Sequence, residues 1–269
     1  MSREKKLFKN EELSKLFNNQ GFIKYKICEE EDLDKLKAYF YKHEKEYTNS
    51  DFHASMNNTD LEAKKRIYNY LNDWGNSKCN NLLIDYSALF ANYIFKRANS
   101  SYKVGIHQDW SYIDEGAFTS INVWLPLIET SEKNGGLYVL PKSHLLPEQP
   151  RFTPFEDPFS EVHDLIKSNS TCIQTSPGEA ILYHSKLIHF SNENSSDQDR
   201  LACAFLMTPN QSSPIHYFKK NQVMLKFDVK PEFFLSFPNY EGLQSYPHTI
   251  VENSPKLSKM QLEAFIKQL

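Results

Sequence analysis

The sequence has few of the residues that mark exported, redox-active or membrane-spanning chains. Its 269 residues include four cysteines, widely scattered and without the CxxC pairs that bind zinc or perform redox work. No apolar stretch approaches the roughly 18 residues that a transmembrane helix requires. A net charge of −3 gives no general electrostatic reason to bind nucleic acid or anionic membrane. We therefore expect a cytoplasmic protein with buried thiols and with neither nucleic acid nor membrane as a partner.

Glycine is also scarce, with 8 residues, whereas aromatic side chains make up 14% of the chain. This composition argues against disorder and for a packed core. A chain of this length can bury a substantial core as one large domain. We see no internal repeat and no linker long enough to divide it, so we expect a single domain over residues 1–269.

The first third of the chain is expected to be mostly helical. Residues 11–19 and the charged stretch 30–48 predict helices, and the alternating run FIKYKI between them predicts a strand. Apolar residues recur at helical spacing over 60–73. The next stretch, NNLLIDYSALF (80–90), is expected to continue as a short buried helix. The helical part thus covers about residues 1–85.

The middle of the chain, about residues 86–210, is rich in strand signals. Seven short runs of β-branched and aromatic residues are each bounded by Gly, Pro, Asn or Ser: ANYIFKR, KVGIHQDWSYI, FTSINVWLPLI, GGLYVLP, GEAILYH, SKLIHFS and RLACAFLMT. Few helices intervene, so the runs predict an antiparallel sandwich or barrel with flanking helices, a mainly β fold.

The signals weaken after Pro209, in a C-terminal extension of about residues 211–269. The segment KPEFFLSFPNYEGLQSYPH is expected to be an aromatic loop punctuated by prolines. A terminal helix should follow, with Ser254 as its N-cap and Pro255 at its first position.

One short motif, GIHQDWSY (105–112), suggests a metal site. In a strand, residues i and i+2 face the same side, so His107 and Asp109 would present an imidazole and a carboxylate together. An HxD triplet also arises by chance, so a third ligand must be found. Two histidines and a carboxylate form the facial triad of non-haem Fe(II) oxygenases. The distant candidates are His184 and His189, and the triplet does not choose between them.

The residues that follow His189 favour it as the third ligand. Arg200 stands at the start of RLACAFLM, where hairpin pairing would bring it alongside His189. A buried arginine facing the cavity needs an anion. A dicarboxylate co-substrate that chelates the metal at one end would supply that anion at the other. Ser191 would lie on the same strand face and add a hydroxyl donor.

Three segments of the chain resemble the successive motifs of the phytanoyl-CoA dioxygenase family: HQDWSYIDE, INVWLPLIETSEKNGGLYVLPKSH and PGEAILYHSKLIHFSNENSSDQDRLA. The resemblance covers about residues 85–208, and the N-terminal helices loosely. It implies Fe(II)- and 2-oxoglutarate-dependent oxygenase chemistry on a double-stranded β-helix, the cupin-like jelly roll. At Lys142 the chain departs from the family, which has glycine in this turn, and a change of loop shape alone is expected.

The resemblance also implies roles for individual residues. The iron ligands would be His107, Asp109 and His189. Arg200 and Ser191 would bind the distal carboxylate of 2-oxoglutarate. Trp124 and Asn92 would line the co-substrate pocket. Lys96 matches a lysine that is frequent in the family, and the resemblance assigns it no role.

The implied enzyme uses Fe(II), 2-oxoglutarate and O2 to hydroxylate an unactivated C–H bond of a small organic metabolite, releasing succinate and CO2. Two other functions suit the same residues. One is a jelly-roll protein that binds a ligand without catalysis, and the other is a zinc-dependent hydrolase, since two histidines and a carboxylate also hold catalytic zinc. The sequence specifies neither the substrate nor the oligomeric state, because residues from 212 onward match no family motif.

Overall fold

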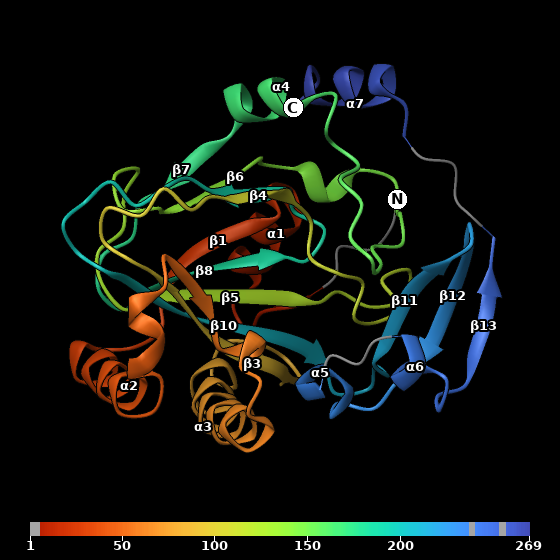
Figure 1. The fold of residues 1–269 in the computed structure, drawn as a ribbon. Helices are drawn as coiled ribbons and strands as arrows, with labels where there is room; N and C mark the ends of the chain where they lie inside the picture. The colour runs from red at the N-terminus through yellow and green to blue at the C-terminus, as the bar shows by residue number, and fades with distance from the viewer. Residues whose placement is uncertain (1–5, 237–239, 253–256) are drawn as a thin grey trace.

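Two antiparallel sheets form the centre of the structure, and helices cover their outer sides (Figure 1). The computed structural model describes residues 6–236, 240–252 and 257–269. The larger sheet has the order β1 (Phe22–Lys26), β8 (Glu179–His184), β5 (Ile121–Pro126), β10 (Arg200–Pro209), β3 (Tyr86–Lys96) and β2 (Phe52–Ala54). The smaller sheet has the order β4 (Val104–His107), β9 (His189–Ser191), β6 (Leu137–Val139) and β7 (Thr171–Ile173). The predicted mainly β jelly-roll core with flanking helices is confirmed.

Strand alternation sorts the side chains of the larger sheet between its two faces. In β3, Tyr93 and Phe95 belong to the buried cluster beneath the helices. Asn92 and Ile94, at the intervening positions, line a cavity between the sheets. In β10, Arg200 lines the same cavity. The inner face of this sheet therefore carries two of the polar residues that the sequence marked as functional, Asn92 and Arg200.

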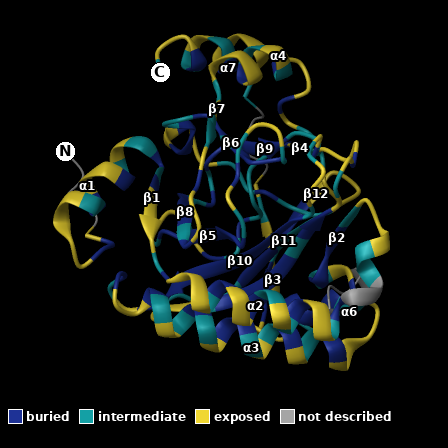
Figure 2. Ribbon diagram, turned by 90° about the vertical axis from the view of Figure 1, so that its left-hand side faces the viewer, coloured by how far each residue is buried: buried dark blue, intermediate teal, exposed yellow. Residues whose placement is uncertain are grey.

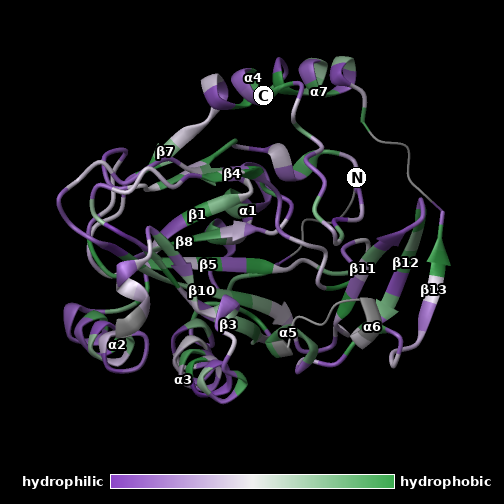
Figure 3. Cartoon of the chain, viewed as in Figure 1, coloured by the Kyte–Doolittle hydropathy of each residue, from purple (hydrophilic) through white to green (hydrophobic). Residues whose placement is uncertain are grey.

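Helices from the N-terminal third cover the outer face of the larger sheet. They are α1 (Glu11–Gln20), α2 (Glu30–His43) and α3 (Leu61–Cys79), and short 3-10 turns span Lys45–Asn49 and Ser55–Asn57. Figure 2 shows the buried sides of α2 and α3 turned toward the sheet, and Figure 3 shows hydrophilic and hydrophobic residues alternating around both helices. Asp60 caps α3 by accepting hydrogen bonds from the N–H groups of Glu62 and Ala63.

Two helices far apart in the sequence cover the outer side of the smaller sheet. They are α4 (His163–Asn169) and α7 (Lys259–Ile266), which lie together at the top of Figure 1. Leu262 and Ile266 of α7 are buried in the apolar cluster that also contains Ile166 of α4. The predicted cap residues Ser254 and Pro255 lie outside the described residues. The described helix begins after Ser258, whose hydroxyl accepts a hydrogen bond from the N–H of Gln261.

The short buried helix expected over residues 80–90 is wrong. Asp85 adopts a φ of 55°, which turns the chain, and Tyr86 then begins strand β3. β3 pairs with β10 along its whole length. Non-local pairing has therefore overridden the local pattern, which suits a helix or a strand equally well.

The C-terminal extension contains more regular structure than expected. A separate three-stranded sheet is formed by β11 (Ile215–Lys220), β12 (Val223–Asp228) and β13 (His248–Val251). Asn221 and Gln222, with φ values of 47° and 67°, make the tight turn between β11 and β12. The expected loop before β13 contains the short helices α5 (Phe233–Ser236) and α6 (Tyr240–Leu243). Within the described residues, no helix is long and apolar enough to cross a membrane.

Candidate active site

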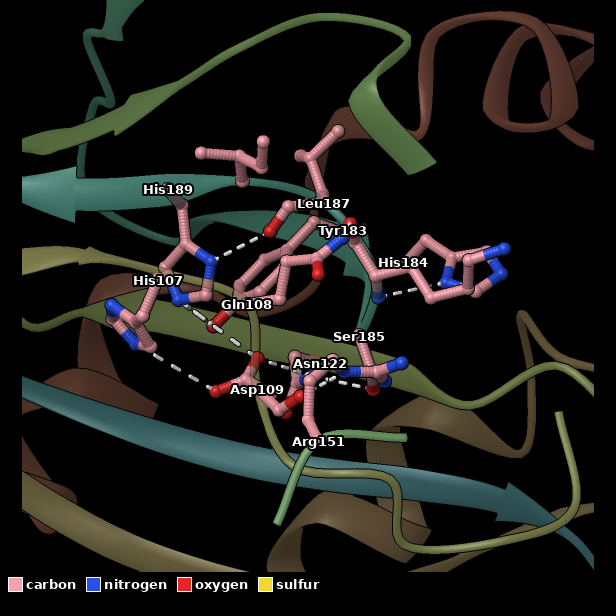
Figure 4. A network of polar contacts seen from close by, with 12 residues as sticks. His107, Gln108, Asp109, Asn122, Arg151, Tyr183, His184, Ser185, Leu187 and His189 are labelled. Atoms are coloured by element: carbon pink, nitrogen blue, oxygen red, sulfur yellow. Dashed lines mark hydrogen bonds and ion pairs between the residues drawn. The ribbon is translucent and has the colours of Figure 1, made fainter. Parts of the chain in front are cut away.

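Three side chains from two distant segments of the sequence converge between the sheets (Figure 4). His107 ends β4, Asp109 follows it two residues later, and His189 begins β9. β4 and β9 are paired, with His107 and His189 as cross-strand partners whose ring centroids lie 4.2 Å apart. One ligand atom from each of the three residues lies within 4.8 Å of the other two. This is the donor set of a metal site with two histidines and one carboxylate.

Hydrogen bonds determine which nitrogen of each imidazole is available to a metal. Nδ1 of His107 lies 2.8 Å from the carbonyl oxygen of Gly105, and Nδ1 of His189 lies 2.9 Å from that of Leu187. A carbonyl only accepts, so Nδ1 carries the proton and Nε2 keeps its lone pair. The two Nε2 atoms lie 3.9 Å and 3.8 Å from the oxygens of Asp109, too far for hydrogen bonds. This spacing and these lone pairs fit an ion held between the three groups.

The electrostatics of His189 also suit a metal ligand. Burial lowers the pKa of His189 to about 4, and the nearby charge of His107 acts in the same direction. The imidazole of His189 is therefore neutral near pH 7, which is the form that coordinates a metal.

Polar side chains of the larger sheet hold the carboxylate of Asp109. The Asn122 amide on β5 donates to Oδ2 of Asp109 at 2.9 Å and to the hydroxyl of Ser185, also at 2.9 Å. Ser185 in turn accepts a hydrogen bond from the hydroxyl of Ser120 at 2.7 Å. These contacts tie one carboxylate oxygen of Asp109 to the larger sheet and so fix the direction of the carboxylate. No sequence motif predicted them.

A buried ion pair anchors the segment that carries Asp109. Two guanidinium nitrogens of Arg151 each lie 2.5 Å from a carboxylate oxygen of Glu115, and Nε donates to the backbone carbonyl of Asp109. The side chains of Arg151 and Glu115 are 9% and 1% exposed. Such a bidentate pair fixes geometry as well as charge, so it holds residues 109–115 in place. No motif in the sequence predicted this pair.

A cavity of about 270 Å³ lies beside the triad, and Arg200 forms part of its wall. The Arg200 side chain is almost completely buried. Its Nη1 lies 3.4 Å from the carbonyl of Ile94, and its Nε has no hydrogen-bond partner among the described residues. Burial lowers the pKa of Arg200 to about 10, so the group stays charged near pH 7. A buried guanidinium with an unused donor requires an anion.

The other predicted site residues line the same cavity: Ser191 from β9, Trp124 from β5 and Asn92 from β3. The ring centroid of Trp124 lies 5.6 Å from the guanidinium carbon of Arg200. The expected hairpin pairing of Arg200 with the His189 strand is wrong, because β9 and β10 belong to different sheets. The arginine and the metal ligands therefore approach the cavity from opposite sheets.

His184, the alternative third ligand, lies apart from the triad. It ends β8, and its ring is stacked on that of Phe17 with centroids 6.3 Å apart. Its Nδ1 accepts a hydrogen bond from the backbone N–H of Lys186 at 3.0 Å. The structure therefore leaves His189 as the histidine that joins His107 and Asp109.

Two further cavities extend from the triad along the edge of β4. One, of about 420 Å³, shares His107 and Asp109 with the inner cavity. The other, of about 400 Å³, lies against residues 146–161 and shares Trp110 and Phe155 with the first. Phe155 is 59% exposed, so this connected path leads from the surface to the metal ligands.

The turn that contains Lys142 shows why glycine suits this position. Lys142 adopts a φ of 63°, in the left-handed region that glycine enters without steric cost, and precedes the 3-10 turn Ser143–Leu145. The loop therefore keeps a glycine-like backbone despite the lysine.

Comparison with known proteins agrees with the site geometry. The family model of phytanoyl-CoA dioxygenase (PhyH) matches residues 14–202, a range that includes the triad and Arg200. The chain belongs to the phytanoyl-CoA dioxygenase family. A phytanoyl-CoA dioxygenase domain-containing protein 1 homolog of Dictyostelium discoideum is 29% identical over 41% of this chain and 42% of its own. Phytanoyl-CoA dioxygenase 1 of Oryza sativa subsp. japonica is 27% identical over 52% and 50%. The chain thus spans about half the length of these relatives.

Solved structures share the fold of this phytanoyl-CoA dioxygenase family member. The non-heme alpha ketoglutarate dependent carbocyclase SnoK from nogalamycin biosynthesis has a TM-score of 0.57 and 13% identity, covering 76% of this chain and 86% of its own. The epimerase SnoN, solved with Fe3+, alpha ketoglutarate and nogalamycin RO, has a TM-score of 0.54 and 14% identity, covering 76% and 85%. At this level of identity the likeness establishes the fold alone.

Proposed function

We propose that the chain is an Fe(II)- and 2-oxoglutarate-dependent dioxygenase that hydroxylates an unactivated C–H bond of a small organic molecule. The substrate R–H, dioxygen and 2-oxoglutarate would become R–OH, succinate and CO2. The observation that carries the proposal is that one cavity contains both the triad and a buried Arg200 with an unused donor. Family membership supports it.

Different residues of the cavity would bind the metal and the co-substrate. His107, Asp109 and His189 would hold iron from one side and leave the opposite positions open. Arg200 would form a charge-assisted pair with the distal carboxylate of 2-oxoglutarate, and Ser191 would donate a hydroxyl to the same group. When bound, iron and 2-oxoglutarate supply the activation of dioxygen that side chains cannot perform.

The outer cavities favour an apolar organic substrate. Trp110, Tyr112 and Phe155 line the path over β4, and Met56 lies at its inner end, where it also lines the triad cavity. Such aromatic walls bind apolar surface and limit the access of water. A substrate seated there would bring one of its C–H bonds to the open side of the triad.

Loading the protein with Fe(II) and 2-oxoglutarate without oxygen tests the proposal. We expect a weak visible charge-transfer band and, with oxygen, succinate formation stimulated by a substrate found in a metabolite screen. Asp109→Ala should abolish iron binding and succinate formation. Arg200→Met should retain iron and bind 2-oxoglutarate roughly 10- to 100-fold more weakly, because a hydrogen bond to a charged group contributes about 1.5–3 kcal/mol. The exposed Arg97→Met is the control.

Three outcomes would contradict the proposal. Normal succinate formation by Asp109→Ala would exclude the triad as the catalytic metal site. Tight zinc binding without the charge-transfer band would point instead to a hydrolase. Binding of a ligand with no metal and no turnover would point to a jelly-roll protein without catalysis.

A further inference from the structure

Lys96, the last residue of β3, is a second buried basic side chain next to Arg200. Its side chain is fully buried, and in the β3–β10 register its Cα is the partner of the Arg200 Cα. Lysine is almost never fully buried without a partner, and like charges directly opposite each other in a sheet are destabilising. No described carboxylate forms an ion pair with Lys96 or with Arg200. Two adjacent basic groups in the interior need a reason to be there.

The ammonium group of Lys96 is held by neutral acceptors. Nζ lies 2.9 Å from the hydroxyl oxygen of Ser191 and 2.5 Å from the backbone carbonyl of Asn192. Gly135, with a φ of 71°, leaves room for it, because a Cβ at that position would lie 3.2 Å from Nζ. These contacts, and the space beside Gly135, hold Nζ of Lys96 against the hydroxyl of Ser191.

This contact determines where the Ser191 hydroxyl can point. Once Lys96 is protonated, its ammonium group donates and cannot accept, so the hydroxyl oxygen of Ser191 accepts from Lys96 and the Ser191 hydrogen remains available. Ser191 lines the triad cavity together with Arg200, whereas Lys96 stands behind it and does not line the cavity. The hydroxyl hydrogen and the guanidinium are thus free to meet the same anion.

We propose that Lys96 is a positioning residue for the co-substrate, orienting the Ser191 hydroxyl and adding positive charge behind the seat of the distal carboxylate. This inference rests on the proposed function. It gives the two buried basic groups a common purpose, because the distal carboxylate would lie beside both of them.

The titration of Lys96 offers a direct readout. Burial lowers the pKa of Lys96 to about 7, with the charge of Arg200 acting in the same direction and that of Glu193 opposing it. Glu193 is itself paired with Lys103 at 2.7 Å, and Gly135, Ser191 and the Asn192 carbonyl bring no charge. A bound anion would favour the protonated ammonium and raise this pKa. Binding of 2-oxoglutarate near pH 7.5 should therefore take up protons from solution.

The test compares Lys96→Met with Lys133→Met, an exposed lysine in the loop before Gly135. In iron-loaded protein, we expect Lys96→Met to raise KM for 2-oxoglutarate about tenfold, which is about 1.4 kcal/mol, and to leave kcat at saturating co-substrate within a factor of about two. Calorimetry in buffers of different ionisation enthalpy should show proton uptake in wild type and Lys133→Met and not in Lys96→Met. An unchanged KM, or a loss of kcat alone, would overturn the proposal.

Ser191→Ala keeps the inference testable if Lys96→Met does not fold. This variant retains the lysine and removes the hydroxyl that it orients, so KM for 2-oxoglutarate should rise by a similar factor. An unchanged KM in Ser191→Ala, or no proton uptake in wild type, would overturn the assignment. The wild-type charge-transfer band separates the two proposals. Its absence refutes both, whereas a normal band with equal 2-oxoglutarate affinity in Lys96→Met and Lys133→Met refutes the role of Lys96 alone.

Discussion

Asn122 should determine how tightly the site binds its metal, although its own side chain is not a ligand candidate. Its amide donates at 2.9 Å to the Asp109 carboxylate and so fixes the direction of that ligand. Asn122→Leu removes a hydrogen bond to a charged group, which contributes about 1.5–3 kcal/mol. At about 1.4 kcal/mol for each factor of ten, the affinity for Fe(II) should fall roughly 10- to 100-fold.

Anaerobic titration of the metal-free protein with Fe(II) measures this effect. Ser120→Ala is the matched control, because it removes the 2.7 Å contact to Ser185 in the same network and leaves the bond from Asn122 to Asp109 in place. We expect the control to bind Fe(II) as wild type does. Wild-type affinity in a folded Asn122→Leu protein would refute the orienting role.

Three other predictions concern stability and ligand choice. Burial lowers the pKa of both His189 and His216 to about 4, so the folded protein holds these imidazoles neutral. Their contribution to the free energy of unfolding of the metal-free protein should be complete above about pH 6.5 and should be lost as pH drops toward 4. Urea melts should show a shallower fall for His216→Gln, and an identical profile would exclude this histidine as a source. Arg151→Met leaves the Glu115 charge buried and unpaired, so it should lower the free energy of unfolding by about 3–5 kcal/mol, and adding Glu115→Leu should restore part of that loss. Free coenzyme A should not raise Tm. The described walls of the outermost cavity carry three carboxylates, Glu156, Asp157 and Glu161, which would repel its phosphates. The guanidinium of Arg151 in the same walls is already paired with Glu115. A saturable rise in Tm would contradict this.

The strands and the metal triad were predictable because their signals are local. Each of the seven expected runs overlaps an observed strand, and the HxD spacing places two donors on one side of an extended segment. The choice of His189 over His184 agrees with the structure, although one reason for it was wrong. Arg200 faces the cavity from the other sheet, and sequence spacing does not reveal which sheet a strand joins.

The remainder depends on partners that are distant in the sequence. Residues 80–90 form an apolar run that suits a helix or a strand, and pairing with β10 decides the outcome. Asn122 and Ser185 are ordinary polar residues until the fold brings them to Asp109. Asn122 did carry one usable signal, because it lies two residues before Trp124 and alternation puts both on the same face.

The metal ligands belong to the segment around β4 and β9, whereas Arg200 belongs to the other sheet. A diacid bound at one end to the metal and at the other to Arg200 would therefore link the two sheets and restrict their movement relative to each other. Amide hydrogens of β3, β4, β9 and β10 should exchange more slowly with deuterated water once iron and 2-oxoglutarate are both present. Iron alone should slow exchange in β4 and β9 only, so the rigidity of the sandwich reports how completely its interior is filled.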